Sequence, residues 1–117
     1  VDQPPFLNIA IKGKTNLSPP ELLAYLKGLE EKIGRKKTFR YGPRQIDLDI
    51  IFYDDQVVTL PNLQIPHPRM SERAFVLKPM VDIAPDFIHP VLNKSVAQLL
   101  AELPPEQGIL QVTDWQP

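Results

Sequence analysis

Hydrophobic residues dominate the stretch from Ile46 to Tyr53, and two carboxylates interrupt it. Its length and its content of isoleucine, leucine and aromatic residues predict a buried β-strand. Residues two apart in a strand project from the same face, so Asp47 and Asp49 are expected side by side. Burying both is costly unless a cation lies between them, and paired acidic oxygens suit Mg²⁺, which usually brings substrate phosphates with it. The alternative interpretation is an edge strand whose acidic face is open to water.

Two helices are predicted by their capping residues and apolar stripes. The first spans residues 18–34, where Ser18 and Glu21 form a capping box and Gly34 supplies the stop. The second spans residues 95–103 and begins with a serine cap. The inward stripes are predicted to be Leu22, Leu26, Leu29 and Ile33 in the first helix, and Val96, Leu99, Leu100 and Leu103 in the second. The charged residues interpreted as a solvated face of the first helix are Lys27 and Glu30.

Shorter elements are expected between and around these. Residues 6–11 alternate between two faces, as in a strand. Residues 54–56 form a turn, and residues 57–60 form a short extended piece. Residues 71–77 have the composition of a short helix, which is expected to stop before Pro79.

The proline spacing in residues 63–70 excludes a helix there and predicts a stiff extended loop around His67. A lone histidine is more often structural, and His89 is given that interpretation. A histidine fixed between two prolines has little conformational entropy left to lose on binding, which favours a binding role for His67.

Composition and charge narrow the possible classes of protein. At 117 residues the chain has the size of one domain, with 43% hydrophobic and 23% charged residues, as in soluble globular proteins. The net charge of −1 gives no general attraction to nucleic acid or to a membrane surface. The absence of cysteine excludes a disulfide framework and thiolate chemistry. With that charge, nucleic acid is not expected as a partner. Neither a transmembrane run nor a signal-peptide pattern is present, so a membrane is not expected as a partner and a cytoplasmic location is expected.

A cluster of basic residues runs directly into the two aspartates. Alone, such a cluster is equally well explained by exposed side chains that complement the helix C-terminus. Next to a carboxylate pair that can bind a metal, it favours a site for a polyphosphate. The cluster comprises Lys32, Arg35, Lys36, Lys37, Arg40 and Arg44.

Three sequence blocks together resemble the 6-hydroxymethyl-7,8-dihydropterin pyrophosphokinase family. They are Phe-Leu-Asn at residues 6–8, Gly-Pro-Arg-x-Ile-Asp-Leu-Asp-Ile at residues 42–50, and Ile-Pro-His-Pro-Arg-Met-x-x-Arg-x-Phe at residues 65–75. The trailing Leu-x-Pro-Met-x-x-Ile-Ala-Pro of residues 77–85 also fits. The resemblance covers the chain from about Val1 to Leu103 and implies an enzyme of folate biosynthesis. Such an enzyme transfers diphosphate from ATP to the hydroxymethyl group of the pterin and releases AMP, with two Mg²⁺ ions clamping the triphosphate.

The resemblance also implies a role for particular residues. Asp47 and Asp49 resemble the metal ligands, and no residue stands out as a general base. Arg44 resembles a catalytic, phosphate-contacting arginine, and Arg35 resembles the catalytic arginine of a mobile loop that closes over the substrates. The other implied contacts are His67 and Arg73 to the ATP phosphates, Asn8 to the edge of the pterin, and Phe6 and Phe75 to its two faces.

The fold implied by the resemblance is α+β, a ferredoxin-like sandwich of an antiparallel sheet covered by helices. The strand, helix and second strand that open the family's chain have no counterpart here. Residues 1–117 are therefore expected to be a single domain that is the C-terminal portion of a pyrophosphokinase domain. The N-terminal part is expected from a longer chain or from a second polypeptide.

Two other functions are compatible with these residues. One is a non-catalytic, ferredoxin-like module that binds a nucleotide, and the other is a metal-dependent phosphohydrolase. The aromatic pair Phe6 and Phe75, together with Asn8, favours a second, planar substrate that neither alternative needs.

Overall fold

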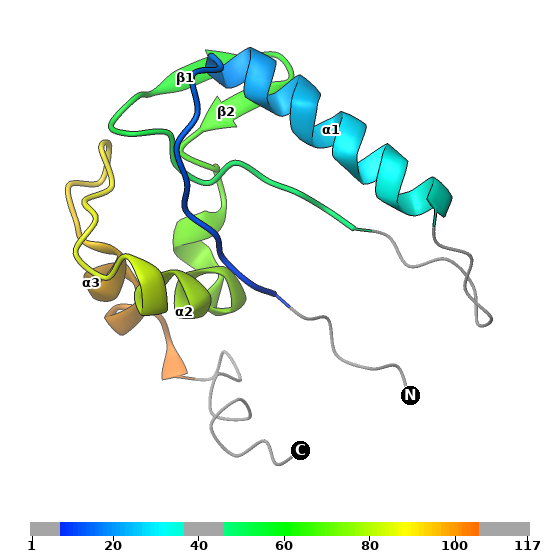
Figure 1. Ribbon diagram of the computed structural model, residues 1–117. Coiled ribbons are helices and arrows are strands. Elements are labelled where there is room, and N and C mark those ends of the chain that lie inside the picture. Colours follow the sequence, from blue (N-terminus) through cyan, green and yellow to red (C-terminus); the bar gives the residue numbers. More distant parts are fainter. Residues whose placement is uncertain (1–7, 37–45, 106–117) are drawn as a thin grey trace, which may run out of the picture. The chain divides into compact units, whose positions relative to one another are not determined.

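The computed structural model describes residues 8–36 and 46–105, and these form a small α+β structure (Figure 1). These residues divide into two compact units, one within residues 14–67 and the other combining residues 8–13 with residues 68–105. The elements are α1 (Pro19–Lys36), β1 (Val58–Leu60), β2 (Leu63–Ile65), a 3₁₀ helix η1 (Met70–Glu72), α2 (Ala74–Ile83) and α3 (Val96–Ala101). Within the described part of the chain, none of the helices combines the length and the apolar composition needed to cross a membrane.

Helix α1 begins with the expected capping box. The backbone N–H of Ser18 donates to Glu21 Oε1 at 2.8 Å, and the backbone N–H of Glu21 donates to Ser18 Oγ at 3.3 Å. The bond from the Ser18 backbone N–H, together with a hydrogen bond from the Ser18 side chain to the carboxylate, lowers the pKa of Glu21. The expected stop at Gly34 is wrong, because the helix continues to Lys36. A glycine inside a helix costs only about 1 kcal/mol relative to alanine, and the arginine and lysine that follow favour the helical conformation.

The core of the unit within residues 14–67 is built on a two-stranded antiparallel sheet. Strand β1 pairs with β2 in a register that places Val58 opposite Ile65 and Leu60 opposite Leu63. The inner side chains of β2, Leu63 and Ile65, are buried together with Ile50. The partly buried side chains packed against this core are Leu22, Leu23, Leu26, Tyr53 and Val58. The predicted inward stripe of α1 is therefore confirmed at Leu22 and Leu26.

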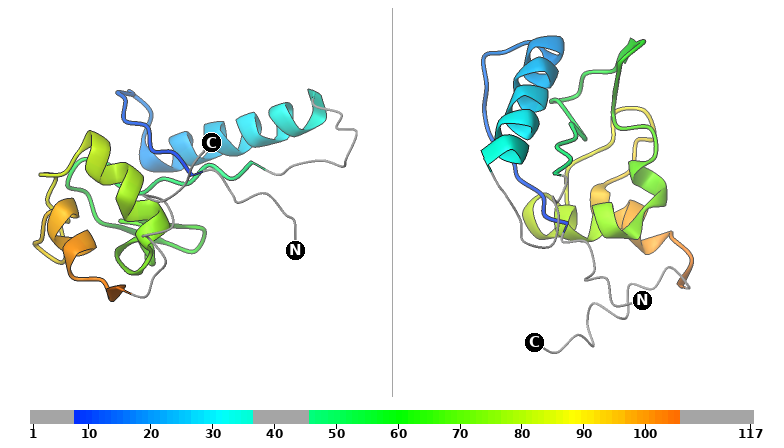
Figure 2. Two further views of the ribbon diagram at one scale, coloured as in Figure 1. Left: turned by 90° about the horizontal axis from the view of Figure 1, so that it is seen from below. Right: turned by 90° about the vertical axis from the view of Figure 1, so that its right-hand side faces the viewer.

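The stretch of residues 46–53 runs back along α1 but is not a strand (Figures 1 and 2). At one end the Tyr53 hydroxyl donates to the carbonyl of Leu17, and at the other the backbone N–H of Leu48 donates to Glu30. A strand needs a neighbouring strand to form its ladder of hydrogen bonds, and the described residues provide none for this stretch. The predicted strand is therefore wrong here, although alternate side chains are still buried.

The first predicted strand has a similar outcome. Residues 8–11 lie outside any strand, whereas residues 6 and 7 lie outside the described part of the chain. Ile9 and Ile11 are 70% and 82% exposed. An alternating strand is stable only when its apolar face packs against other residues, and within the described residues neither isoleucine is packed in this way.

In the other unit, η1 and α2 replace the short helix expected over residues 71–77. The predicted end before Pro79 is wrong, because α2 continues through Pro79 to Ile83. A proline inside a helix removes one backbone hydrogen bond and costs about 3 kcal/mol. The burial of Leu77 and Met80 on the same helix, which packs against α3, offsets that cost. The buried hydrophobic side chains of this unit are Met70, Ala74, Leu77, Met80, Val96 and Leu99.

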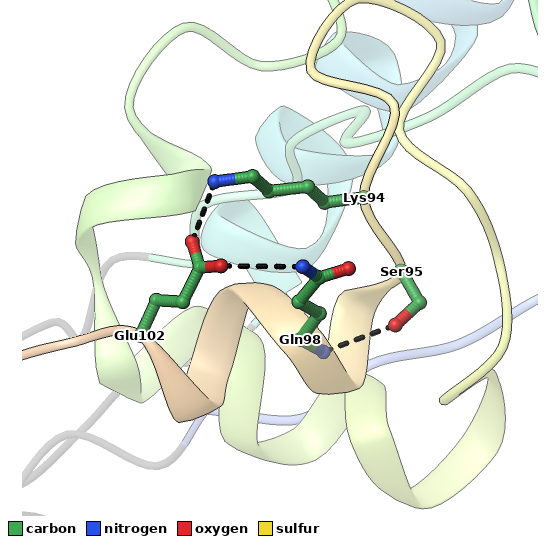
Figure 3. A network of polar contacts seen from close by, with 4 residues as sticks. All are labelled: Lys94, Ser95, Gln98 and Glu102. Atoms are coloured by element: carbon green, nitrogen blue, oxygen red, sulfur yellow. Dashed lines mark hydrogen bonds and ion pairs between the residues drawn. The ribbon is translucent and has the colours of Figure 1, made fainter.

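Helix α3 has the predicted serine cap. Ser95 Oγ accepts from the backbone N–H of Gln98 at 3.0 Å (Figure 3). Beyond the cap, Glu102 accepts from Lys94 Nζ at 2.7 Å and from Gln98 Nε2 at 3.3 Å. The hydrogen bond from Lys94 lowers the pKa of Glu102. These polar contacts are exposed and contribute little to stability. The helix ends at Ala101, two residues before the predicted end.

Candidate functional site

Asp47 and Asp49 lie on the water-facing side of an extended stretch. Both are exposed, whereas Ile46 and Leu48 are half-buried and Ile50 is buried. This alternation agrees with the expectation that the two carboxylates share one side. The expected burial is wrong: both side chains are open to water, as in the alternative interpretation of this stretch. The apolar side chains of this stretch lie on its buried side. The carboxylates therefore stay hydrated and avoid the free-energy cost of desolvation.

The oxygen donors of Asp47 and Asp49 suit Mg²⁺. This ion is usually bound by one or two carboxylates and completes its octahedral shell with water and substrate phosphates. Within residues 8–36 and 46–105, no group of three or more His, Cys, Asp or Glu side chains comes together that could hold a metal ion. Two exposed carboxylates on one side of the stretch are a donor set that fits an ion bound jointly with a phosphate ligand.

His67 is attached to the same stretch of chain. Its backbone N–H donates to the carbonyl oxygen of Ile51 at 2.9 Å, and its side chain is half-buried. Pro66, which precedes it, is buried. The structure therefore fixes the backbone of His67 alongside the stretch that carries Asp47 and Asp49.

Arg73 and Phe75 form a pair at the start of α2. The guanidinium carbon of Arg73 lies over the Phe75 ring, 5.6 Å from its centroid, in a cation–π contact. Phe75 is 53% exposed, so core packing, the ordinary explanation for a phenylalanine, does not account for it. A large aromatic surface open to solvent is suited to stacking against a flat ligand.

The other predicted site residues are described less completely. Phe6 and Arg44 lie outside the described residues, and Arg35 is described only as part of the last turn of α1. Asn8 is exposed. One compact unit contains Asp47, Asp49 and His67, and the other contains Asn8, Arg73 and Phe75.

Sequence reasoning missed Glu30. It was assigned to the solvated face of α1, but its side chain is only 18% exposed. Glu30 Oε2 accepts the backbone N–H of Leu48 at 2.5 Å and lies 3.3 Å from Lys27 Nζ. Leu48 lies between the two aspartates. Its hydrogen bond to Glu30 joins residues 18 positions apart, so no periodicity in the sequence indicates it.

His89 has a structural role, in agreement with its interpretation from the sequence. The residue is 6% exposed, and its Nδ1 accepts from the backbone N–H groups of Val91 and Leu92 at 3.1 and 3.0 Å. Burial lowers the pKa of His89. The neutral imidazole thus stabilises the turn that precedes α3.

Acidification is expected to weaken the fold through His89. Because the pKa of the folded form is lowered, the unfolded state binds the proton first, and stability falls as the pH drops below the ordinary value of 6.5. Protonation at Nδ1 also removes the acceptor for both N–H groups. Denaturant unfolding at about pH 7.5 and about pH 5.5 measures the loss.

An asparagine at position 89 keeps an acceptor close to the place of Nδ1 but does not titrate in this range. His89→Asn is therefore expected to lose part of the pH dependence, whereas His67→Asn, at the chain's other histidine, is expected to keep it. An unchanged pH dependence in His89→Asn would show that His89 is not its source.

A comparison of the chain with known protein families gives a match over residues 1–85 to the family described as 7,8-dihydro-6-hydroxymethylpterin-pyrophosphokinase (HPPK). The chain belongs to this family. The matched residues include both aspartates, His67, Arg73 and Phe75, and the resemblance inferred from the sequence blocks is confirmed.

Relatives of known name agree with this family. The chain is 44% identical over 103 residues to the 2-amino-4-hydroxy-6-hydroxymethyldihydropteridine pyrophosphokinase of Pseudomonas aeruginosa, covering 88% of this chain and 63% of the relative. The Aquifex aeolicus protein of the same name is 42% identical over 97 residues, which is 83% of this chain and 61% of the relative. The folic acid synthesis protein FOL1 of Dictyostelium discoideum is 48% identical over 103 residues, which is 88% of this chain but 16% of that protein. The chain thus spans less than two thirds of the length of these relatives.

Proposed function

We propose that this chain contributes to an enzyme that transfers diphosphate from ATP to the hydroxymethyl oxygen of 6-hydroxymethyl-7,8-dihydropterin and releases AMP. The family match over residues 1–85 carries the proposal. The exposed carboxylates of Asp47 and Asp49, on one side of an extended stretch, support it.

In this reaction the hydroxymethyl oxygen attacks the β-phosphorus of ATP. The bond between that phosphorus and the oxygen bridging to the α-phosphate breaks, AMP leaves, and the hydroxyl proton is released. Catalysis then rests mainly on positioning and on the neutralisation of phosphate charge. Asp47 and Asp49 would hold Mg²⁺, two ions being the family's expected number, and the bound metal supplies that neutralisation.

The remaining site residues are proposed to bind the two substrates. The proposed contacts to the ATP phosphates are Arg44, His67 and Arg73, and the proposed pterin pocket is formed by Phe6, Asn8 and Phe75. Arg35, like Arg44, is proposed as a catalytic arginine. The exposed Phe75 ring supports this assignment, since one of its faces carries the Arg73 guanidinium and a flat ligand needs only one face for stacking.

We also propose that residues 1–117 are the C-terminal portion of one ferredoxin-like pyrophosphokinase domain. The alternating burial of residues 46–50 supports a strand that forms once a neighbouring strand supplies the ladder. That strand is proposed to come from the part of the domain that the relatives contain and this chain does not span.

The identity of the phosphorus products tests the reaction. With the native-length protein, MgATP and the pterin, ³¹P NMR is expected to show AMP and the pterin diphosphate in equal amounts. ADP with a pterin monophosphate would contradict diphosphate transfer. AMP or ADP formed with free phosphate or pyrophosphate, and with no phosphorylated pterin, would favour the phosphohydrolase instead.

A further inference from the structure

We propose that Glu30 is a positioning residue, which holds the backbone between Asp47 and Asp49 so that both carboxylates can bind one phosphate-linked divalent cation. The inference rests on the proposed function in one respect, namely that these two aspartates bind the cation. It concerns a residue that has no contact with the cation itself.

The hydrogen bond places the constraint at the middle of the aspartate pair. Glu30 Oε2 accepts the backbone N–H of Leu48 at 2.5 Å. That peptide group joins Asp47 to Leu48, so fixing it restricts the backbone torsions through which both carboxylates are oriented. A charged acceptor makes such a bond stronger than one between neutral groups.

Glu30 is itself held firmly. It lies within the 18-residue helix α1, and its side chain is only 18% exposed. Lys27 Nζ lies 3.3 Å from the same oxygen, one helical turn earlier, and balances part of the charge. The carboxylate is therefore presented from a rigid element rather than from a loop.

The rest of the stretch is anchored further along the chain. Ile50 is buried in the core of this unit, the Ile51 carbonyl accepts from His67, and the Tyr53 hydroxyl donates to Leu17. These contacts all lie on the C-terminal side of Asp49. The bond from Leu48 to Glu30 lies on the other side of Asp49, between the two aspartates.

A third-ligand role for Glu30 fits less well than positioning. Within the described residues, Glu30 does not join the two aspartates in a group of three side chains able to hold a metal ion. Its oxygen is instead occupied by a backbone donor and a lysine. Mg²⁺ demands near-ideal octahedral geometry, so small errors in carboxylate placement weaken its binding.

Three substitutions separate positioning from charge and from general stability. Glu30→Asp keeps the charge but shortens the side chain by one methylene, and so loses the reach to Leu48. Glu30→Gln loses the charge but keeps an oxygen acceptor at the same distance. Glu31→Ala removes a neighbouring exposed carboxylate of the same helix and is the matched control.

The first measurement needs no metal. Hydrogen exchange of the Leu48 amide, followed by NMR in the native-length protein, is expected to speed up in Glu30→Asp and to stay slow in Glu30→Gln and Glu31→Ala. The amide of Leu77, in the other unit, reports whether each variant is folded. Unchanged protection of Leu48 in Glu30→Asp would overturn the proposal.

The second measurement is Mn²⁺ titration by electron paramagnetic resonance, with a non-hydrolysable ATP analogue present. Glu30→Asp is expected to bind Mn²⁺ about 10- to 100-fold more weakly, while Glu30→Gln and Glu31→Ala stay close to the wild type. Equal weakening in the Asp and Gln variants, or none in the Asp variant, would overturn the positioning role. If the wild type itself bound no Mn²⁺, the proposed metal site would fail and this inference with it. If the wild type binds Mn²⁺ and Glu30→Asp binds it equally well, the inference alone fails.

Discussion

Replacing Asp47 or Asp49 by alanine is expected to lower pterin-dependent AMP release by more than about 100-fold. Loss of a residue that only hydrogen-bonds to a metal ligand typically lowers metal affinity or activity by about 10- to 100-fold, and loss of a ligand itself is expected to cost more. Each substitution removes one of two proposed oxygen ligands from an ion that must neutralise the charge of the triphosphate. Both side chains are exposed, so their loss leaves the packing of Ile50 and its neighbours intact. The loss is therefore expected in the rate and in Mg²⁺ affinity, with little change in the midpoint of thermal unfolding.

The matched control for these substitutions is Asp55→Ala. Asp55 is also exposed and lies in the turn that follows the same stretch, but it has no proposed part in the site. Asp54 is unsuitable as a control because its φ of 51° favours the aspartate over an alanine. Near wild-type activity in Asp47→Ala and Asp49→Ala, or an equal loss in Asp55→Ala, would contradict the assignment of the metal site.

Leu77→Ala is expected to lower the free energy of unfolding by about 2 to 5 kcal/mol. Leu77 is 0% exposed and lies on α2, which packs against α3, so its truncation leaves a cavity that these short helices cannot easily fill. Urea denaturation of the native-length protein, followed by far-UV circular dichroism, measures the change.

Leu92→Ala removes the same atoms from a side chain of the same unit that is 43% exposed. Its cost is expected to stay within about 0.5 kcal/mol, as for most surface substitutions. Similar losses in Leu77→Ala and Leu92→Ala would show that the core of this unit is not packed as the structure describes.

Local signals determined the parts of the fold that the sequence predicted well. The capping box at Ser18 and the serine cap at Ser95 act through bonds within three residues, so the sequence alone locates both helix starts. Helix ends were less predictable. Helix α1 continues past Gly34 because the residues that follow favour a helix, and α2 continues past Pro79 because the burial of its neighbours offsets the cost of the proline.

Strands depend on partners from other parts of the chain, and this explains the errors over residues 8–11 and 46–53. Alternation of apolar and polar residues correctly predicted that Asp47 and Asp49 share one side of residues 46–50, but the expected burial of that side was wrong. It could not supply the neighbouring strand, which a ladder requires and which the described residues lack.

The same distinction applies to the candidate site. Asp47 and Asp49 became candidates because carboxylates in an apolar stretch are conspicuous, and Phe75 became one because its sequence block is specific. Glu30 was not found, because its bond to Leu48 depends on how α1 lies against residues 46–53 and leaves no trace in local periodicity. Residues that act through a backbone group of another segment are in general visible only in a structure.

The most direct test of the proposed function is AMP release from MgATP by the native-length protein, measured with and without 6-hydroxymethyl-7,8-dihydropterin. A pyrophosphokinase is expected to release AMP only when the pterin is present, in proportion to the pterin consumed. AMP release that is the same without the pterin would contradict the account and favour hydrolysis. Nucleotide binding by a folded protein that releases no AMP under either condition would also contradict it, and would favour the non-catalytic nucleotide-binding module.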